Sequence, residues 1–283
     1  MRDSYDKVFR SLSYSLDAVA GVWVEEAPMT EGREDFGLCV IRGDLWAVGG
    51  EDVVWGEERS RIRIGSLRSC TRLDVATHTW VRGPDMATAR SSFGVGVLDG
   101  EVWAIGGMDS DDNTLSSCER LDAVTGTWVA GPDMTMPREG HRVVVLRGEL
   151  WVVARDCCTT ERLDAAANRW VRGPDRAHER HYFAVAVFRG QLWVVGGINE
   201  RDKAMSSCEF LDVASNTWMA GPPMNTPRYC HSLAVLDGEL WATGGVNGGE
   251  DLQSCERLDA ATNVWVVGPD LPNTRYQHCC AVI

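Results

Sequence analysis

Short apolar runs recur in pairs along the chain. The first run of a pair, for example Phe93–Leu98, leads into a two-residue turn that ends in glycine. A second run follows the turn, and Leu45–Val48 is the second run of an earlier pair. Four consecutive apolar residues do not alternate, so they indicate a strand buried on both faces. Glycine in a two-residue loop favours a β-hairpin. The hairpin turns are predicted at Arg42-Gly43, Asp99-Gly100, Arg147-Gly148, Arg189-Gly190 and Asp237-Gly238.

Two further strands are predicted after each hairpin. The third strand ends in Leu-Asp, and the fourth carries a tryptophan that stands two residues after Gly, Asn or His. These residue types tolerate a positive φ better than most, so one turn geometry is expected each time. The turn positions are Gly21, His78, Gly126, Asn168, Asn216 and Asn263.

The tryptophans recur at intervals of roughly 40 to 60 residues, a period typical of propellers and solenoids. No sustained helical periodicity accompanies them, which argues against a helical solenoid. A unit of four short strands cannot bury both faces alone, so radial stacking is expected. The pattern predicts an all-β, six-bladed β-propeller forming a single domain over residues 1–283. Its blades are expected at 33–82, 90–130, 138–172, 180–220, 228–267, and 275–283 together with 1–25.

The combination of an arginine, a Gly-Gly pair, Leu-Asp and a tryptophan resembles the kelch repeat. It is most similar to the propeller of the BTB–kelch (kelch-like) adaptor proteins, and it covers nearly the whole chain. The resemblance implies that the two ends share the sixth blade, with Arg275–Ile283 as its first strand and Ser11–Asp17 and Gly21–Trp23 as its third and fourth. The structural repeat positions are Gly49, Gly50, Gly106, Gly107, Gly196, Gly197, Gly244, Gly245, Trp80, Trp128, Trp170, Trp218 and Trp265.

Two departures from the repeat stand out. The sixth blade has no recognisable second strand, so either residues near Ser4–Phe9 replace it or the chain is a fragment of a longer one. The third repeat has Ala154-Arg155 in place of Gly-Gly, followed by a short loop. We expect either a locally altered blade or recruitment of Arg155 to a surface role.

Charge and hydropathy narrow the class of partner. The net charge of −13 disfavours nucleic acid and anionic membranes, which require basic surfaces. The N-terminal segment lacks the apolar stretch of a secretory signal, and no run approaches the length of a membrane-spanning helix. The sequence therefore predicts a soluble, cytoplasmic protein.

Eight of the ten cysteines fall into two groups. Cys70, Cys118, Cys208 and Cys255 share one position in the third strand, where they are expected to be small buried thiols too far apart for disulfides. Cys157-Cys158 and Cys279-Cys280 are adjacent pairs and a weak zinc signal. A redox-sensing role for Cys157 or Cys158 is the alternative interpretation.

No catalytic or metal-binding constellation is predicted. His141, His231 and His278 occupy positions where other repeats have phenylalanine, which favours packed aromatic residues over a metal site. Asp109–Asn113 begins like a calcium loop but lacks its later glycine and glutamate. Neither a catalytic residue nor a cofactor is expected.

The resemblance implies a partner-binding surface at one mouth of the propeller channel. In kelch adaptors it is formed largely by residues just after the repeat arginine and just after Gly-Gly. The first residues after the arginine are Glu34, Ser91, Glu139, His181, Tyr229 and Tyr276, and the second are Asp35, Ser92, Gly140, Tyr182, Cys230 and Gln277. The residues after Gly-Gly are Glu51, Met108, Ile198 and Val246, with Asp156 in the third repeat.

The connection between Gly50 and Cys70 is unusually long and contains Trp55 among several arginines. Tryptophan and arginine are frequent anchors of protein interfaces. Trp55 is therefore a candidate partner contact, and a flexible insertion or extended hairpin is the alternative.

These features predict a non-enzymatic protein-interaction module. The resemblance implies a role like that of the substrate-recognition propeller of a cullin-RING ubiquitin ligase. The partner is expected to be a protein or peptide. The alternatives are an actin-binding scaffold or, less favoured, a kelch-fold enzyme such as a copper oxidase or a sialic-acid isomerase.

Overall fold

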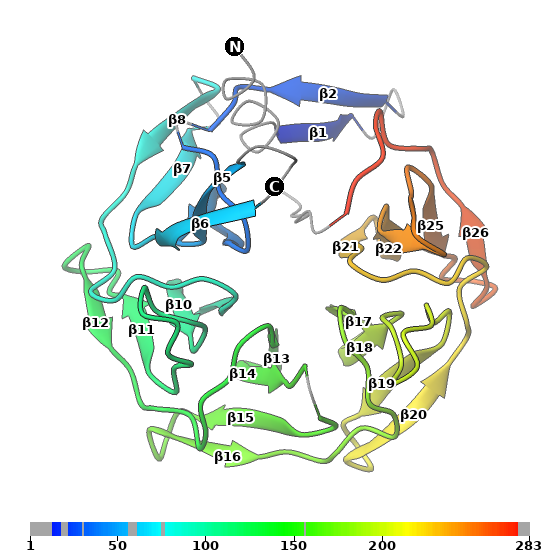
Figure 1. Cartoon of the computed structure of the whole chain (residues 1–283). Coiled ribbons are helices and arrows are strands. Elements are labelled where there is room, and N and C mark those ends of the chain that lie inside the picture. The colour runs from blue at the N-terminus through cyan, green and yellow to red at the C-terminus, as the bar shows by residue number, and fades with distance from the viewer. Residues whose placement is uncertain are drawn as a thin grey trace. The chain divides into compact units, whose positions relative to one another are not determined.

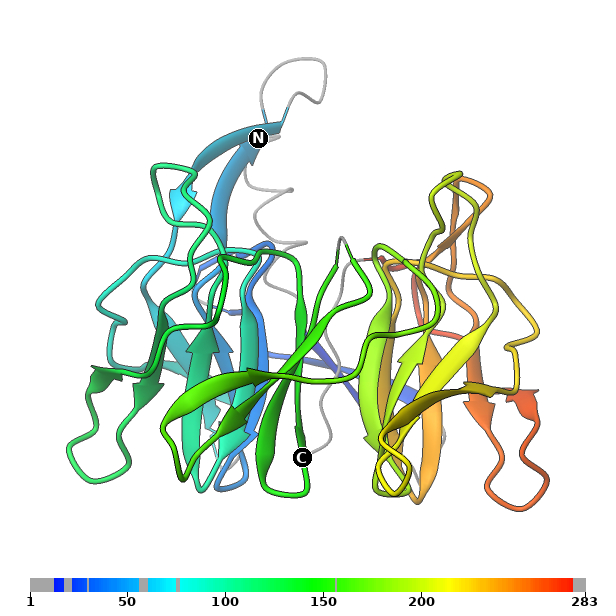
Figure 2. The same ribbon diagram turned by 90° about the horizontal axis from the view of Figure 1, so that it is seen from below.

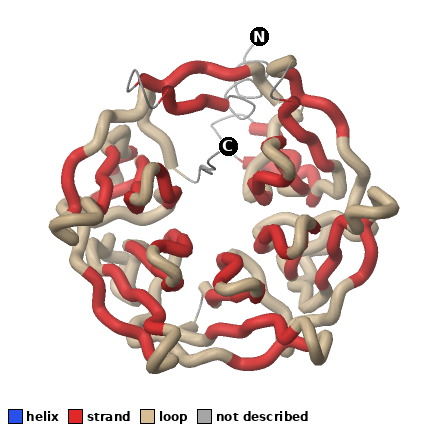
Figure 3. Tube along the Cα trace, turned by 180° about the vertical axis from the view of Figure 1, so that it is seen from behind, coloured by secondary structure: helices blue, strands red, loops and turns tan. Residues whose placement is uncertain are grey.

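The computed structural model describes residues 13–17, 22–29, 31–55, 61–74, 77–155 and 157–276. Residues 13–17, 22–26, 53–55 and 61–63 are described by their backbone alone. All regular elements among the described residues are β-strands joined by loops and turns (Figure 3). The all-β prediction is confirmed.

Five four-stranded antiparallel sheets, called blades 1 to 5 below, contain most of these strands (Figure 1). Blade 1 contains β3 (Gly37–Ile41), β4 (Asp44–Val48), β7 (Cys70–Asp74) and β8 (Thr79–Arg82). Blade 2 contains β9 (Gly94–Leu98), β10 (Glu101–Ile105), β11 (Cys118–Leu121) and β12 (Trp128–Ala130). Blade 3 contains β13 (Arg142–Leu146), β14 (Glu149–Val153), β15 (Thr160–Asp164) and β16 (Arg169–Arg172). Blade 4 contains β17 (Ala184–Phe188), β18 (Gln191–Val195), β19 (Cys208–Asp212) and β20 (Thr217–Gly221). Blade 5 contains β21 (Ser232–Leu236), β22 (Glu239–Thr243), β25 (Cys255–Leu258) and β26 (Trp265–Val267).

Three two-stranded sheets complete the secondary structure of the described residues. One pairs β1 (Ser13–Asp17) with β2 (Val22–Glu26). The other two are hairpins that follow the second strand of a blade, namely β5 (Glu51–Trp55) with β6 (Arg61–Ser66) and β23 (Val246–Asn247) with β24 (Glu250–Asp251).

The chain divides into two compact units, one ending at Glu139 and the other beginning at Gly140. The first unit contains blades 1 and 2, and its strands β3 and β9 lie side by side. The second unit contains blades 3, 4 and 5. There β13 lies beside β17, and β17 beside β21. Within each unit, neighbouring blades therefore meet through their first strands.

The predicted turns have the expected backbone conformation. Both residues of each hairpin turn have positive φ, for example 53° at Arg42 and 87° at Gly43. The turn before each fourth strand also has positive φ, with 53° at His78 and 47° at Asn168. Glycine, asparagine and histidine therefore share one conformational role, as the sequence indicated. Gly21 lies outside the described residues.

Tryptophans join neighbouring blades within a unit. The Nε1 group of Trp128 donates to the carbonyl of Pro84, at 3.1 Å, in the linker that leaves blade 1. Trp218 and Trp265 make the same bond to Pro174 and Pro222, each at 3.0 Å. Buried side chains of both blades surround these contacts, such as Val48 with Phe93 in the first unit and Trp193 with Leu240 in the second. Each interface therefore combines apolar packing with one directed hydrogen bond.

The prediction of six blades is not met by the described residues, which form five four-stranded blades. The β1–β2 hairpin coincides with the predicted third and fourth strands of a sixth blade. A two-stranded sheet lacks the two inner strands that a blade requires. Residues 277–283, predicted to supply most of the first of them, lie outside the described residues. A sixth blade shared by the two ends stays a prediction.

Candidate partner-binding surface

The arginine that opens each of the five blades is buried. In blades 1, 2, 4 and 5 its hydrogen bonds fix the loops around it. In blade 2, Arg90 is fully buried and its Nη1 donates to the carbonyls of Gly106, at 2.9 Å, and Ser117, at 2.8 Å. Its Nη2 pairs with Glu119 at 3.0 Å. Arg180 and Arg228 repeat this arrangement with Glu209, at 2.5 Å, and Glu256, at 2.8 Å. The guanidinium thus joins the end of the second strand to the start of the third.

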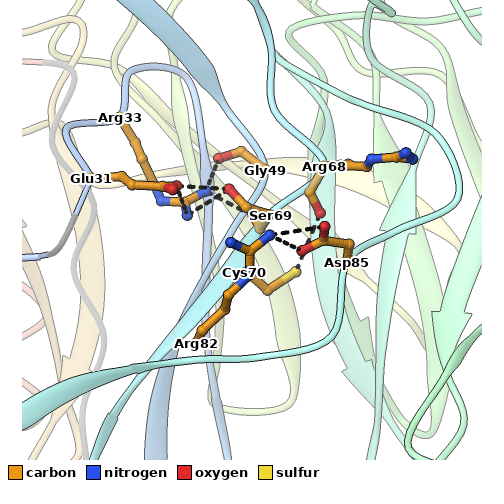
Figure 4. A network of polar contacts seen from close by, with 8 residues as sticks. All are labelled: Glu31, Arg33, Gly49, Arg68, Ser69, Cys70, Arg82 and Asp85. Atoms are coloured by element: carbon orange, nitrogen blue, oxygen red, sulfur yellow. Dashed lines mark hydrogen bonds and ion pairs between the residues drawn. The ribbon is translucent and has the colours of Figure 1, made fainter.

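Blade 1 reaches the same arrangement with a different carboxylate. Thr71 occupies the position of the buried glutamate, and Glu31 supplies the negative charge from the segment before the blade. Figure 4 shows Arg33 bonded to Glu31 at 2.9 Å and to the carbonyls of Gly49 and Ser69 at 2.7 Å. A buried guanidinium needs a paired charge and filled hydrogen bonds, which explains why the carboxylate is replaced rather than lost.

Residues after the repeat arginine pair directly with residues after Gly-Gly. The backbone groups of Ser91 and Met108 exchange two hydrogen bonds, at 3.0 and 2.9 Å. The same bridges join Glu34 to Glu51, His181 to Ile198, and Tyr229 to Val246. The two sets of residues that the resemblance implied are therefore neighbours within each of these four blades.

The second glycine of each pair makes this bridge possible. A Cβ atom on Gly107 would lie 2.5 Å from the carbonyl oxygen of Ser91, and one on Gly197 would lie 2.6 Å from that of His181. Both glycines also have positive φ, 89° and 99°. Only glycine combines that conformation with so close a backbone approach.

The candidate residues differ in how accessible they are. Glu51, Ser91 and Val246 are buried, so their side chains are not available to a partner in this structure. Tyr276 is half exposed, at 52%. Gln277 and Asp156 lie outside the described residues, and the side chain of Trp55 is not described. The partly exposed candidates are Glu34, Met108, Glu139, Arg155, His181, Tyr182, Ile198 and Tyr229.

Three candidates from blades 3, 4 and 5 form one cluster. The guanidinium of Arg155 lies over the ring of Tyr182, 4.7 Å from its centroid, and its Nη2 donates to the phenol oxygen at 3.0 Å. The rings of Tyr182 and Tyr229 have centroids 6.4 Å apart. Arg155, which replaces the second glycine of the repeat, is therefore part of an aromatic surface.

A groove of about 370 Å³ lies beside Tyr229. Lys203 and Asp202 line it from the loop after β18, and Asn247 and Gly248 from the β23–β24 hairpin. Burial raises the pKa of Tyr229, and nearby Asp251 and Asp202 act in the same direction, so the phenol is a neutral donor at neutral pH. Sequence reasoning did not identify Lys203 or Asn247, because they lie in loops that have no fixed place in the repeat.

The long connection in blade 1 is a β-hairpin with a register shift between Asp52 and Val53. In Figure 2 its strands β5 and β6 extend beyond the sheet of blade 1. The Ser66 hydroxyl bonds at its base to the Ser91 hydroxyl at 3.0 Å and the Met108 carbonyl at 3.1 Å. The extended-hairpin alternative is therefore confirmed, and binding by Trp55 stays a prediction.

The residues considered for metal binding either close a turn or are buried in the fold. Asp109 accepts the backbone N–H groups of Asp111 and Asn113, each at 2.9 Å, and so closes its own turn. His141 and His231 are buried. Within the described ranges, no group of three or more histidine, cysteine or acidic side chains could hold a metal ion. The described part of the chain contains no helix that is long and apolar enough to cross a membrane.

The repeated blades, four of them fixed by the bonds of a buried arginine, define a propeller-type repeat protein. The Kelch motif matches residues 32–87, 89–135, 179–225 and 227–272, which together make up more than half of the chain. The chain therefore belongs to the kelch-repeat family. The blade whose Gly-Gly is replaced, blade 3, is the one that the motif does not match.

Curated relatives are kelch-like proteins. Kelch-like protein 28 of Mus musculus is 33% identical over 87 residues, which cover 31% of this chain and 15% of that protein. Kelch-like ECH-associated protein 1A of Danio rerio is 32% identical over 93 residues, which cover 33% of this chain and 14% of that protein. The similarity thus spans about a seventh of the length of each relative.

The fold is similar to a solved structure titled "Structure of YjhT". The TM-score is 0.76 at 14% sequence identity, and the match covers 92% of this chain and 91% of the other. At this identity the likeness establishes the fold alone.

Proposed function

We propose that this chain is a protein-interaction module that binds a protein or peptide partner through the loops after the repeat arginine and after Gly-Gly. The observation that carries the proposal is the cluster of Arg155, Tyr182 and Tyr229 beside the groove lined by Lys203. Tyrosine and arginine dominate the hot spots of protein interfaces. The similarity to kelch-like proteins supports the same function.

The rigid frame below these loops suits recognition. Arg180 and Arg228 hold the bases of the loops in blades 4 and 5 through buried bonds, while the residues after them differ in type. Binding residues on a fixed scaffold lose little conformational entropy on association. The loops can therefore vary without disturbing the blades.

The relatives also support a more specific role. We propose that the bound partner is a substrate presented to a cullin-RING ubiquitin ligase, as the resemblance to BTB–kelch adaptors implies. We propose a cytoplasmic location for this role. The eight described cysteines are free thiols, as expected in a reducing compartment. Depleting the protein from cells should then lengthen the half-life of its partner.

Affinity capture on the immobilised chain tests the binding surface. A partner identified with the unaltered chain should bind Tyr182→Ala/Tyr229→Ala at least about 30-fold more weakly, the loss expected from hot-spot residues. Arg155→Ala should also weaken binding. Arg169→Ala is the matched control, because Arg169 is an exposed arginine of blade 3 at the other end of its strands.

Three results would contradict the proposal. Equal affinity of the double-tyrosine variant and the unaltered chain would exclude this surface. If the unaltered chain co-sediments with actin filaments and the Tyr182→Ala/Tyr229→Ala variant does so to the same extent, the scaffold alternative is favoured. Stoichiometric copper in the purified protein would favour an enzyme.

A further inference from the structure

The connection between the second and third strands of blade 3 departs from that of the other blades. Blades 1 and 5 have a hairpin there, and blades 2 and 4 have turns closed by Asp109 and Asn199. In blade 3 only five residues separate Ala154 from Thr160, and two of them are Cys157 and Cys158. Adjacent cysteines thus occupy a shortened loop.

These two thiols are more accessible than the other described cysteines. Cys39, Cys70, Cys118, Cys208, Cys230 and Cys255 are buried, whereas Cys157 and Cys158 are partly exposed. Burial raises the pKa of Cys39, Cys70 and Cys208 to about 12, which leaves them protonated and inert. Any thiol chemistry of the described chain is therefore expected at Cys157 and Cys158.

A buried arginine lies against this pair. Arg176 occupies the linker position at which three other repeats have Met86, Met134 and Met224 and the fifth has Leu271. Its side chain is only 3% exposed and lies over the ring of Phe183 at 4.7 Å. Burial lowers its pKa to about 10, so it stays charged at neutral pH. A charge has therefore replaced a buried thioether in this one linker.

The hydrogen bonds of Arg176 connect it to the cysteine loop. Its Nη2 donates to the carbonyls of Ala154 and Cys157, each at 2.8 Å, and its backbone N–H donates to the carbonyl of Cys158, also at 2.8 Å. The Nε and Nη1 groups have no hydrogen-bond partner within the described structure. Two buried donors of a cation thus remain for an acceptor at this loop.

We propose that Cys157 and Cys158 form a site of reversible oxidation by hydroperoxides, with Arg176 stabilising the negative charge that develops on Cys158. The coupling between the two side chains supports this assignment. The pKa of Cys158 lies above the ordinary thiol value, because burial raises it and Arg176 offsets only part of that rise, so the thiolate is the minor form at neutral pH. The charge of Cys158 in turn raises the pKa of Arg176.

The reaction has two steps. The Cys158 thiolate attacks one oxygen of the hydroperoxide, the O–O bond breaks, and the other oxygen leaves as an alcohol or water after taking up a proton. The Cys157 sulfur, on losing its proton, then attacks the sulfenic acid, an S–S bond forms, and the S–OH group leaves as water. The two thiols lose two electrons and two protons, and the peroxide gains them.

The resulting bridge would be strained. Neighbouring Cα atoms lie about 3.8 Å apart across a trans peptide, whereas disulfides usually span about 4.4 to 6.8 Å. A strained disulfide is reduced easily, which makes the oxidation reversible. Bridging also has to turn the peptide between the two cysteines, and the Cys157 carbonyl is one of the acceptors of Arg176.

Peptide mapping tests the proposal on the whole chain. The protein is treated with hydrogen peroxide, alkylated with N-ethylmaleimide and cleaved with trypsin, which places both cysteines in the peptide of residues 156–162. This peptide should escape alkylation and lose the mass of two hydrogens, and dithiothreitol should reverse both changes. Cys157→Ser should stop at a sulfenic acid, which dimedone traps. The peptides of Cys70 and Cys208 should remain reduced.

Matched variants separate the role of Arg176 from general reactivity. Arg176→Met restores the residue of three other repeats and should fold, yet oxidise about tenfold more slowly, as for a rise of one pKa unit in the thiol. Arg172→Met removes an exposed arginine of the same blade and should oxidise at the original rate. Full alkylation of 156–162 after peroxide treatment would overturn the proposal. Equal rates for Arg176→Met and the unaltered chain would overturn the role of Arg176.

Discussion

The repeat arginine is charged, buried and bonded on several sides, so its contribution to stability depends on its partners. Removing one member of a buried ion pair leaves the other charge without compensation and costs about 3–5 kcal/mol. Arg90 pairs with Glu119 and also bonds two carbonyls, so no neighbouring side chain can replace it. The arginine therefore acts as a structural element of its blade.

We expect Arg90→Ala to lower the free energy of unfolding by about 3–5 kcal/mol because Glu119 stays buried and unpaired. Urea denaturation followed by tryptophan fluorescence measures the change. Arg82→Ala is the control, since Arg82 is 67% exposed in its pair with Asp85 and exposed pairs contribute less than about 1 kcal/mol. Similar losses for both variants would contradict the structural role of Arg90.

Aspartates at the ends of third strands give the fold a pH dependence. The backbone N–H and hydroxyl of Thr125 donate to Asp122 and hold the pKa of its carboxyl below the usual range. The Ser215 hydroxyl does the same for Asp212, and the backbone N–H of Thr262 for Asp259. Because the folded pKa lies below the unfolded value, these carboxylates stabilise the fold above about pH 4, and this stabilisation is lost as the pH falls through the folded pKa.

The triple variant Asp122→Asn/Asp212→Asn/Asp259→Asn should therefore be less stable than the unaltered chain at pH 7. Asparagine keeps the acceptor oxygen and removes the charge, so the difference should shrink as the pH falls below about 4. Thermal unfolding midpoints measured from pH 7 to pH 2 provide the comparison. A constant difference across this range would show that these carboxylates do not contribute through their titration.

At the scale of elements, the bridge between the two loops of a blade depends on the second glycine of each pair. Gly107→Ala should destabilise the protein strongly, because the added Cβ would lie 2.5 Å from the Ser91 carbonyl oxygen. Gly100→Ala is the matched control in blade 2. It also has positive φ, 78°, but no atom lies within 4 Å of its added Cβ, so only the backbone strain of about 1–2 kcal/mol is expected. Equal unfolding free energies would show that the close approach has no energetic role.

The elements were predictable where their signals are local. Hairpin turns such as Asp99-Gly100 and the positive φ of His78 follow from residue types a few positions apart. The role of Arg90 did not, because its partners lie 16 to 29 residues away and become neighbours only when the sheet forms. A serine and a glutamate recur 27 and 29 residues after Arg90 and Arg180, and 26 and 28 residues after Arg228, and this recurrence could have indicated it.

The candidate surface was predictable in place but not in detail. The resemblance identified the loops that carry Tyr182 and Tyr229. In each of these two blades, the backbone bridge between the loop after the arginine and the loop after Gly-Gly follows from the register of the strands. The burial of Glu51 and Ser91 depends on the β5–β6 hairpin and on Ser66, which belong to no repeat position. Irregular segments therefore decide which loop residues remain accessible.

At the scale of the whole molecule, the blades differ in the residue pair that lies beside the tryptophan of the second strand. In blades 1, 2, 3 and 5 the tryptophan of the second strand faces an arginine of the third across the ladder, and this arginine pairs with an acidic residue. The pairs are Arg72–Asp44, Arg120–Glu101, Arg162–Glu149 and Arg257–Glu239. Blade 4 has Phe210 and Gln191 instead, and the ring of Phe210 stacks on Trp193 with centroids 4.9 Å apart.

This difference predicts a measurable coupling between two residues. Phe210→Arg alone should lower stability, because it removes the ring stacking and adds a charge without a partner beside Trp193. Adding Gln191→Glu supplies an acidic partner, as in the four other blades, so the double variant should recover about 0.5–1 kcal/mol relative to additive losses. Urea unfolding of the unaltered chain, both single variants and the double variant gives this coupling directly. If the two losses simply add, the charged pair of the other blades does not transfer to blade 4, and the packing around Trp193 rather than the repeat position determines which pair is accepted.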